Sequence, residues 1–176
     1  MKRPSFFKLQ NGSKDALPFT DQEYKNRLND LREIMSKNNL DAVILTSMQN
    51  IAYYSGFLYC SFGRPYACIV TSKSNIVVSA NIDASQPWRR CYGENLIYTD
   101  WERDNYLKAI ISILKNVKKV GVENDHLTLE RYKKLKDALG NPELIDVAPF
   151  VMSKRMIKSN EEISLITSGA KVADTG

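Results

Sequence analysis

The sequence predicts a mixed α/β domain whose β-sheet carries helices on its faces. Short apolar runs alternate along the chain with segments of helical periodicity, which is the pattern of α/β proteins. Two neighbouring runs, 67–71 and 76–80, carry β-branched residues and flank a short polar segment, which indicates an antiparallel hairpin. Because of this hairpin, we expect a mixed sheet and not an all-parallel one.

The first elements are predicted from a helix-start signal and an apolar run. Thr20 and Glu23 form a capping box, in which each side chain can bond a free amide of the first helical turn. The apolar residues that follow at helical spacing are Tyr24, Leu28, Leu31 and Met35. Residues 42–45 are apolar throughout and predict a strand buried on both faces, and we expect residues 47–50 to form the loop after it.

The second half of the chain continues the alternation of strands and helices. A strand is expected at 96–98, and Asp104 can cap the helix that follows it. Further strands are expected at 118–123 and 144–147, on either side of a charged helix at 128–139. The sequence shows no internal repeat.

The last predicted helix opens with a second capping box, formed by Ser159 and Glu162. Its apolar stripe consists of Ile163, Ile166, Ala170 and Ala173. No segment of the sequence follows that could cover this stripe. We therefore expect a domain boundary near this point, or a second subunit that covers the stripe.

Length and charge limit the classes of partner. The length of 176 residues fits one domain, and a hydrophobic fraction of 43% is enough for a substantial core. Lys and Arg outnumber Asp and Glu by 25 to 20. The surplus lies in short pairs, namely Arg89 and Arg90, Lys118 and Lys119, and Lys133 and Lys134. A nucleic-acid surface needs a denser basic stripe, so we expect a small anionic molecule as partner and no nucleic acid.

The compartment is predicted from what the sequence lacks. No apolar run approaches the ~20 residues of a membrane span, and the basic first segment has no signal-peptide core. We therefore expect a cytoplasmic protein with no membrane partner. Cys60, Cys68 and Cys91 lack CxxC spacing, so they predict free thiols and neither a disulfide framework nor a zinc site.

Recognisable catalytic machinery is missing from the sequence. It contains no HExxH motif, no GxSxG motif and no phosphate-binding glycine loop, and His126 is its one histidine. Glu123 and Asp125 lie beside His126, but acid–base catalysis needs a positioned partner, and a structural role is the more common one for such groups. We predict no catalytic residue, no metal ligand and no cofactor for this chain.

The stretch from Tyr53 to Arg103 concentrates aromatic and arginine side chains. Within it, Pro65 restricts Arg64 to an extended conformation, in which Phe62 and Arg64 leave the backbone on the same side. A guanidinium matches a carboxylate through two hydrogen bonds, and an aromatic ring can take a methyl or cationic group. Phe62 and Arg64 thus predict a site for a small zwitterion. The alternative is that Arg64 bonds carbonyl groups of its own loop beside a core Phe62.

A second aromatic and basic cluster follows within the same stretch. Trp88, Arg89 and Arg90 share about one helical turn after Pro87. Trp and Arg are enriched in subunit contacts. We therefore favour a dimer interface at Trp88, Arg89, Arg90 and Trp101, although the same residues could also steer an anion.

Four segments of the sequence carry a family resemblance, namely NIAYYSGFLYCSFGRPYACIV, SANIDASQPWRRCYGENLIYTDWERDNY, KKVGVENDHLTLE and IKSNEEISLI. They resemble the creatinase/prolidase/aminopeptidase P family, and within it the creatinases more than the peptidases. The resemblance implies a polar tail at 1–18 and an N-terminal α/β domain at 19–156. It implies that residues 157–176 are a linker and the start of the first helix of a pita-bread catalytic domain that this chain lacks.

The same resemblance implies a role for the FGR motif. Creatinases hydrolyse creatine to sarcosine and urea without a metal ion, and their catalytic histidine lies in the C-terminal domain. The chain alone is therefore expected to be inactive. The Phe and Arg of the motif reach the active site of the neighbouring subunit in a homodimer, which implies that Phe62 packs against creatine and Arg64 binds its carboxylate.

Two other functions remain open on the sequence. The chain is also similar to the N-terminal domain of an Xaa-Pro peptidase or a related enzyme, which would bind two metal ions through ligands in the missing half. A full set of metal ligands in the missing half would favour the peptidase, and a lone active-site histidine without that set would favour the creatinase. A third alternative is a non-catalytic module that binds a partner or forms dimers through Trp88, Arg89 and Trp101.

Overall fold

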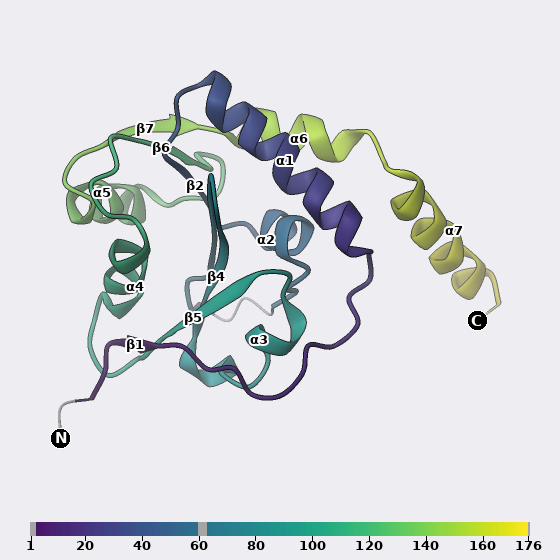
Figure 1. The fold of residues 1–176 in the computed structure, drawn as a ribbon, viewed down its shortest axis with the longest axis horizontal. Coiled ribbons are helices and arrows are strands. Elements are labelled where there is room, and N and C mark those ends of the chain that lie inside the picture. The colour runs from purple at the N-terminus through teal and green to yellow at the C-terminus, as the bar shows by residue number, and fades with distance from the viewer. Residues whose placement is uncertain (1–2, 60–62, 176) are drawn as a thin grey trace.

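A seven-stranded β-sheet forms the centre of the computed structural model, which describes residues 3–59 and 63–175 (Figure 1). The strand order is β1-β5-β4-β3-β2-β6-β7. The strands are β1 (Phe6–Phe7), β2 (Ala42–Leu45), β3 (Ala67–Thr71), β4 (Asn75–Ala80), β5 (Glu94–Tyr98), β6 (Lys119–Val122) and β7 (Glu143–Asp146). β1 and β3 run antiparallel to their neighbours and the other pairs are parallel, so the sheet is mixed, as predicted.

Helices cover both faces of this sheet, as predicted. In Figure 1, α1, α2 and α6 lie on one side of the strands, and α4 and α5 lie on the other. The helices are α1 (Asp21–Lys37), α2 (Met48–Ser55), α3 (Pro87–Arg90), α4 (Asn105–Ile113), α5 (Leu129–Ala138), α6 (Ala148–Met156) and α7 (Asn160–Thr175). A 3₁₀ turn spans Asn81–Asp83.

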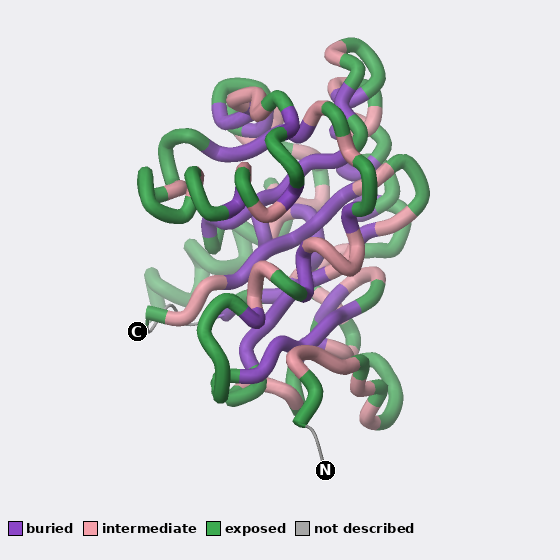
Figure 2. The backbone as a smooth tube through the Cα atoms, turned by 90° about the vertical axis from the view of Figure 1, so that its left-hand side faces the viewer, coloured by how far each residue is buried: buried purple, intermediate pink, exposed green. Residues whose placement is uncertain are grey.

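The central strands carry the hydrophobic core. The tube in Figure 2 is coloured as buried along these strands and as exposed mainly over helices and turns. Every residue of β2 is buried, which confirms the prediction for 42–45. β3 and β4 form the predicted hairpin, with Ile69 opposite Ile76.

The carboxyl ends of most strands lie along one edge of the sheet. β2, β4, β5, β6 and β7 run in one direction, so their carboxyl ends lie along the same edge. The loops at this edge carry Thr46 after β2, Asp100 after β5 and Glu123 after β6. Open α/β sheets bind ligands outside this edge.

The prediction of a loop at residues 47–50 is wrong, because α2 begins there. Ser47 is its N-cap, and its hydroxyl accepts a hydrogen bond from the amide of Asn50 at 3.3 Å. Glu123, directly after β6, completes this helix start and accepts hydrogen bonds from the Ser47 amide at 2.8 Å and the Ser47 hydroxyl at 2.6 Å. A carboxylate at a helix N-terminus is favourable because the amide groups and the helix dipole are positive there.

The predicted polar segment 1–18 contributes a strand to the sheet. β1 pairs with the outer edge of β5, where Phe6 lies opposite Tyr98. Phe6 packs against the hydrophobic core. The Thr99 amide donates to the carbonyl of Ser5 at 2.9 Å and continues this pairing beyond β5.

The start of α1 is joined to the start of α7. Thr20 caps α1 as predicted, accepting from the Glu23 amide at 3.2 Å. The Thr20 amide, however, donates to Glu161 at 3.0 Å and not to Glu23, and its hydroxyl donates to Glu161 at 2.7 Å. Beyond this junction α7 extends away from the sheet (Figure 1), and its apolar residues Ile163 and Ile166 are exposed.

Arg27 lies beneath the same junction and is buried. Its Nε bonds Glu23 at 2.9 Å, its Nη1 donates to the carbonyl of Tyr53 at 2.9 Å, and its Nη2 lies 3.3 Å from a Glu162 oxygen. The guanidinium carbon lies 4.2 Å from the ring centre of Phe19 and 4.1 Å from that of Tyr53. Nε and Nη1 of this guanidinium therefore form hydrogen bonds, Nη2 has an ion pair with Glu162 but no hydrogen bond, and two aromatic rings lie close to the group.

Candidate functional site

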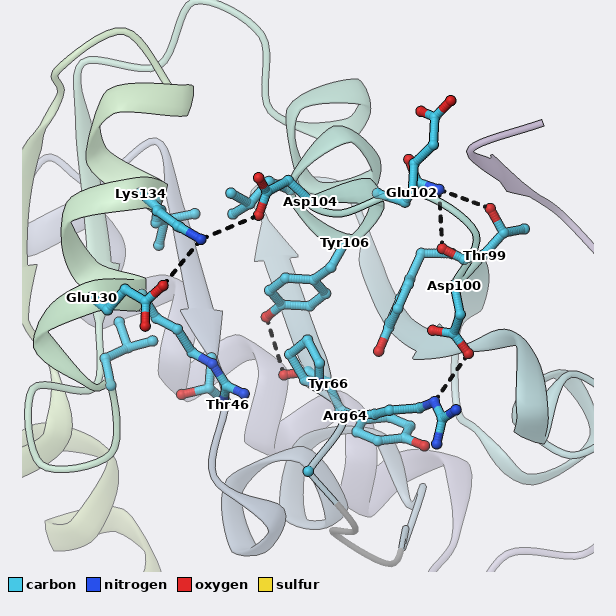
Figure 3. A pocket seen from close by; sticks show the side chains of 18 of the residues that line it. Thr46, Arg64, Tyr66, Thr99, Asp100, Glu102, Asp104, Tyr106, Glu130 and Lys134 are labelled. Carbon is cyan, nitrogen blue, oxygen red and sulfur yellow. Dashed lines mark hydrogen bonds and ion pairs between the residues drawn. The ribbon is translucent and has the colours of Figure 1, made fainter. Parts of the chain in front are cut away.

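The predicted site residue Arg64 lies at the edge of the sheet where the strands end. Gly63 precedes it with a φ of +83°, a backbone conformation that glycine adopts without steric cost. Phe62 and Cys60 lie outside the described residues, so the predicted pairing of the Phe62 ring with the Arg64 guanidinium stays a prediction. Figure 3 shows Arg64 beside Asp100, which follows β5.

The contact between Arg64 and Asp100 uses one nitrogen of the guanidinium. Arg64 Nε lies 3.0 Å from Asp100 Oδ2, and both side chains are 41% exposed. This hydrogen bond raises the pKa of Arg64 above its ordinary value, so the group is positively charged. Among the described residues, neither terminal nitrogen of Arg64 has a hydrogen-bond partner. The outer edge of the guanidinium can therefore accept a ligand carboxylate.

Tyrosine rings form the wall behind Arg64. The rings of Tyr59 and Tyr66 are stacked with their centres 4.1 Å apart, and those of Tyr98 and Tyr106 meet edge to face at 5.5 Å. Tyr59 donates to the carbonyl of Thr46 at 3.1 Å, and burial raises the pKa of Tyr59 to about 12. The phenol is therefore protonated at neutral pH and acts as a hydrogen-bond donor.

A cavity of about 400 Å³ lies in front of these rings (Figure 3). It is bounded by the loops after β2, β5 and β6 and by the first turns of α4 and α5. The charged side chains that line it are Arg64, Asp100, Glu102, Asp104, Glu130, Arg131 and Lys134. Lys134 bridges two of them, at 3.1 Å from Glu130 and 3.6 Å from Asp104. The site thus combines an aromatic wall with a mouth that carries both signs of charge.

Glu123 and His126 stabilise the fold at the other side of the cavity. Glu123 is 1% exposed and accepts hydrogen bonds from Ser47, from the Thr46 amide and from Asn50 Nδ2 at 2.5 Å. His126 is exposed, and its Nδ1 lies 2.9 Å from the hydroxyl of Thr46. These contacts give Glu123 a structural role at the start of α2.

Trp88, Arg89 and Arg90 contact the N-terminal segment of their own chain. Trp88 Nε1 donates to the carbonyl of Gly12 at 2.9 Å, and Arg89 lies 2.6 Å from Asp15. Arg90 lies 3.9 Å from the other oxygen of the same carboxylate. These side chains hold residues 12–15 against α3, and a subunit contact through their remaining surface stays a prediction.

Trp101, the fourth predicted interface residue, is 42% exposed. The Arg3 guanidinium carbon lies 5.4 Å from its ring centre. Trp101 thus has an intrachain contact and an open face, and a role in a dimer stays a prediction.

The described part of the chain provides further findings on metals, thiols and membranes. No group of three potential metal ligands lies together in residues 3–59 and 63–175. Cys68 and Cys91 are buried free thiols. No helix within the same ranges is long and apolar enough to cross a membrane.

Several residues at this site were not singled out from the sequence, and four of them bear on its chemistry. They are Tyr98, Asp100, Asn105 and Arg131. Tyr98 and Asp100 occupy the end of a predicted strand, which is the usual place for ligand-binding side chains in a parallel sheet. The predicted strand at 96–98 could therefore have indicated them. Arg131 could not be recognised in this way, because it is one of many charged residues in the helix predicted at 128–139.

A mixed seven-stranded sheet with helices on both faces and a partly charged cavity at its strand ends defines an α/β domain. Residues 27–157 match the creatinase/prolidase N-terminal domain family. The chain belongs to this family.

Two curated relatives illustrate the range of similarity. The chain is 51% identical over 173 residues to "Creatinase" of Bacillus sp. (strain B-0618), covering 96% of this chain and 42% of that protein. It is 23% identical over 150 residues to "Uncharacterized peptidase YqhT" of Bacillus subtilis, covering 84% of this chain and 40% of that protein. The chain spans less than half the length of these relatives.

Solved structures show the same fold. An Xaa-Pro dipeptidase from Bacillus anthracis matches 86% of this chain and 41% of its own with a TM-score of 0.72 at 21% identity. The creatinase/prolidase N-terminal domain of an X-Pro dipeptidase from Streptococcus pyogenes matches 73% of this chain and 98% of its own, with a TM-score of 0.66 at 18% identity. The predicted family and fold class are thereby confirmed.

Proposed function

We propose that this chain is the N-terminal domain of a creatinase-like hydrolase, which converts creatine and water to sarcosine and urea. The 51% identity to a creatinase over nearly the whole chain supports this activity, since a peptidase-type relative such as YqhT is 23% identical. The domain contributes substrate binding and dimer contacts, and the catalytic groups belong to the missing part. The chain alone therefore has no hydrolase activity.

The observation that carries the proposal is the unused outer edge of the Arg64 guanidinium. Asp100 occupies Nε, and both terminal nitrogens are without a partner among the described residues. A creatine carboxylate can then bond both terminal nitrogens end-on. Two charge-assisted bonds of this kind contribute on the order of 1.5 to 3 kcal/mol when shielded from water.

Asp100 has a positioning role in this proposal. Its bond to Nε fixes the plane of the guanidinium, so that the free edge has a defined direction. Phe62, two residues before Arg64, places its ring against the methylguanidinium part of creatine. The pair acts across a homodimer, in which Arg64 reaches the active site of the neighbouring subunit.

The domain plan follows from the same assignment. Residues 19–156 form the N-terminal domain, and residues 157–176 lead into the catalytic domain. The exposed Ile163 and Ile166 on α7 then pack against that domain. We place the enzyme in the cytoplasm and assign the surfaces of Trp88, Arg89, Arg90 and Trp101 to the dimer.

The test uses the complete enzyme with creatine as substrate and urea release as the measurement. Arg64→Ala is expected to raise KM by roughly tenfold to a hundredfold, because two charge-assisted hydrogen bonds are lost. Arg64→Lys recovers little, since an ammonium cannot replace the planar fork. Arg103→Ala is the matched control, because Arg103 is exposed and does not line the cavity. Unchanged KM in Arg64→Ala contradicts the proposal.

An Xaa-Pro peptidase is the second candidate. The B. anthracis dipeptidase shares the fold, and several curated relatives are named peptidases. Metal analysis of the complete protein separates the two enzymes: two bound metal ions per subunit and cleavage of an Xaa-Pro dipeptide support the peptidase, and urea release from creatine by metal-free protein supports the creatinase.

A further inference from the structure

The loop that carries Arg64 begins and ends at two stacked tyrosines. It joins Tyr59 to Tyr66, and residues 60–62 within it lie outside the described part of the chain. The centres of the two rings are 4.1 Å apart, and the ring planes are inclined by 21°. Both residues are buried. The two ends of the loop are therefore held against each other inside the domain.

Tyr66 is fixed by two further hydrogen bonds. Its hydroxyl donates to Asp83 Oδ2, in the 3₁₀ turn that follows β4. Its carbonyl accepts a bond of 3.2 Å from the hydroxyl of Tyr106 in α4 (Figure 3). Burial and the Asp83 carboxylate raise the pKa of Tyr66, so its phenol is protonated and acts as the donor. The side chain and the backbone of Tyr66 are thus held by two different elements.

The path from Tyr66 back to Arg64 is short and stiff. Only Pro65 separates the two residues. Proline fixes its own φ and restricts the residue before it to an extended conformation. On the other side of Arg64, Gly63 has a φ of +83° and restricts the backbone least of all residues. The direction of Arg64 is therefore set from the side of Tyr66.

Tyrosine hydroxyls are bonded around this loop and not throughout the domain. Among the described residues, the tyrosine hydroxyls that donate to protein groups belong to Tyr59, Tyr66 and Tyr106. The hydroxyls of Tyr24, Tyr54 and Tyr98 are buried without a hydrogen-bond partner in the same part of the chain. Burial alone thus does not account for the bonds at the base of the loop.

We propose that Tyr66 is a positioning residue of the creatine site. Its stack with Tyr59 and its bonds to Asp83 and Tyr106 hold the base of the loop. This fixes the direction in which Arg64 presents its terminal nitrogens to the substrate carboxylate. Asp100 orients the guanidinium, whereas Tyr66 fixes the backbone from which the side chain starts. The inference rests on the proposed function, because Tyr66 acts through Arg64.

The first test uses the complete enzyme with creatine. Tyr66→Phe removes the hydroxyl and keeps the ring and its stack. It is expected to raise KM about threefold to tenfold with kcat nearly unchanged, since a hydrogen bond to a charged acceptor is lost. A merely structural role would lower the amount of folded enzyme, and with it the maximal rate, and would leave KM unchanged.

Tyr54→Phe is the matched control for this variant. It removes the same atom from a fully buried tyrosine that does not line the cavity. The Tyr54 hydroxyl has no hydrogen-bond partner among the described residues. KM and kcat are expected to stay at their wild-type values.

Asp83 variants and a double variant then test the route from Tyr66 to the substrate. Asp83→Asn keeps an oxygen that can accept from Tyr66 and is expected to retain a KM close to that of the wild type. Asp83→Ala is expected to raise KM as much as Tyr66→Phe does. Tyr66→Phe combined with Arg64→Ala is expected to have the KM of Arg64→Ala alone, because coupled residues are not additive.

The possible outcomes separate this inference from the creatine proposal. An unchanged KM in Tyr66→Phe, together with a raised KM in Arg64→Ala, overturns the inference alone. Additive effects in the double variant overturn it as well, because Tyr66 would then act by a route that does not include Arg64. An unchanged KM in Arg64→Ala contradicts the proposed function and this inference with it.

Discussion

Arg27 and Arg64 illustrate two opposite uses of an arginine in this domain. Arg27 is 4% exposed, contacts two carboxylates and a carbonyl, and lies between two aromatic rings. The Arg64 side chain is 41% exposed and contacts one carboxylate through Nε. The two arginines thus differ in how many of their nitrogens already contact a partner within the described residues.

The difference has a physical basis. A buried guanidinium needs compensating charges and hydrogen-bond acceptors close by, because desolvation of an unpaired charge costs several kcal/mol. An arginine at the edge of a cavity can donate its remaining hydrogen bonds to water, and a ligand can then replace that water. Arg27 therefore stabilises the junction of α1 and α7, and Arg64 is available for binding.

The largest expected effect is on stability and comes from Arg27. Arg27→Ala leaves Glu23 and Glu162 without their shared partner and is expected to lower the free energy of unfolding by about 3 to 5 kcal/mol. Urea unfolding of the 176-residue chain measures this change. A loss below 1 kcal/mol would contradict the structural role, and Arg64→Ala is the comparison variant.

Arg64→Ala is expected to destabilise the isolated chain much less than Arg27→Ala does, because an exposed ion pair is screened by water and contributes little to stability. The same urea unfolding experiment measures it. A loss as large as that of Arg27→Ala would remove the distinction between the two arginines and would make Arg64 a structural residue.

Asp100 tests whether Arg64 is positioned. In the complete enzyme, Asp100→Asn is expected to raise the KM for creatine about twofold to fivefold with kcat nearly unchanged, since an exposed ion pair contributes up to about 1 kcal/mol. Asp100→Glu is expected to restore part of the loss. Equal falls in kcat and kcat/KM would contradict a role confined to substrate binding.

The smallest expected effect is on the pH dependence of stability, and it comes from the contact between Thr20 and Glu161. Hydrogen bonds from the Thr20 amide and hydroxyl hold the pKa of Glu161 below its ordinary value. The stabilising contribution is therefore complete above the unfolded pKa and is lost as the pH falls through the folded pKa. An NMR titration of the Glu161 carboxyl checks this, and Thr20→Ala is expected to raise its pKa. An unshifted carboxyl would contradict the contact.

The sequence predicted those features that depend on neighbouring residues. Apolar runs located β2, β3 and β4, and local capping signals located the starts of α1 and α7. It did not predict α2, because the Ser47 cap is completed by Glu123, 76 positions away. The bond from Arg64 to Asp100 likewise joins residues 36 positions apart. Such contacts depend on which strands become neighbours, and local patterns do not determine that.

The bond between Thr20 and Glu161 has a consequence for synthesis of the protein. Thr20 starts the helix that leaves the ribosome before every other helix of the described chain, and its amide partner is 141 positions further on. Domains fold from the N-terminal side during translation. The first helix can therefore form with its local cap from Thr20 to Glu23, while the bonds from Thr20 to Glu161 are added only when the start of α7 has been translated.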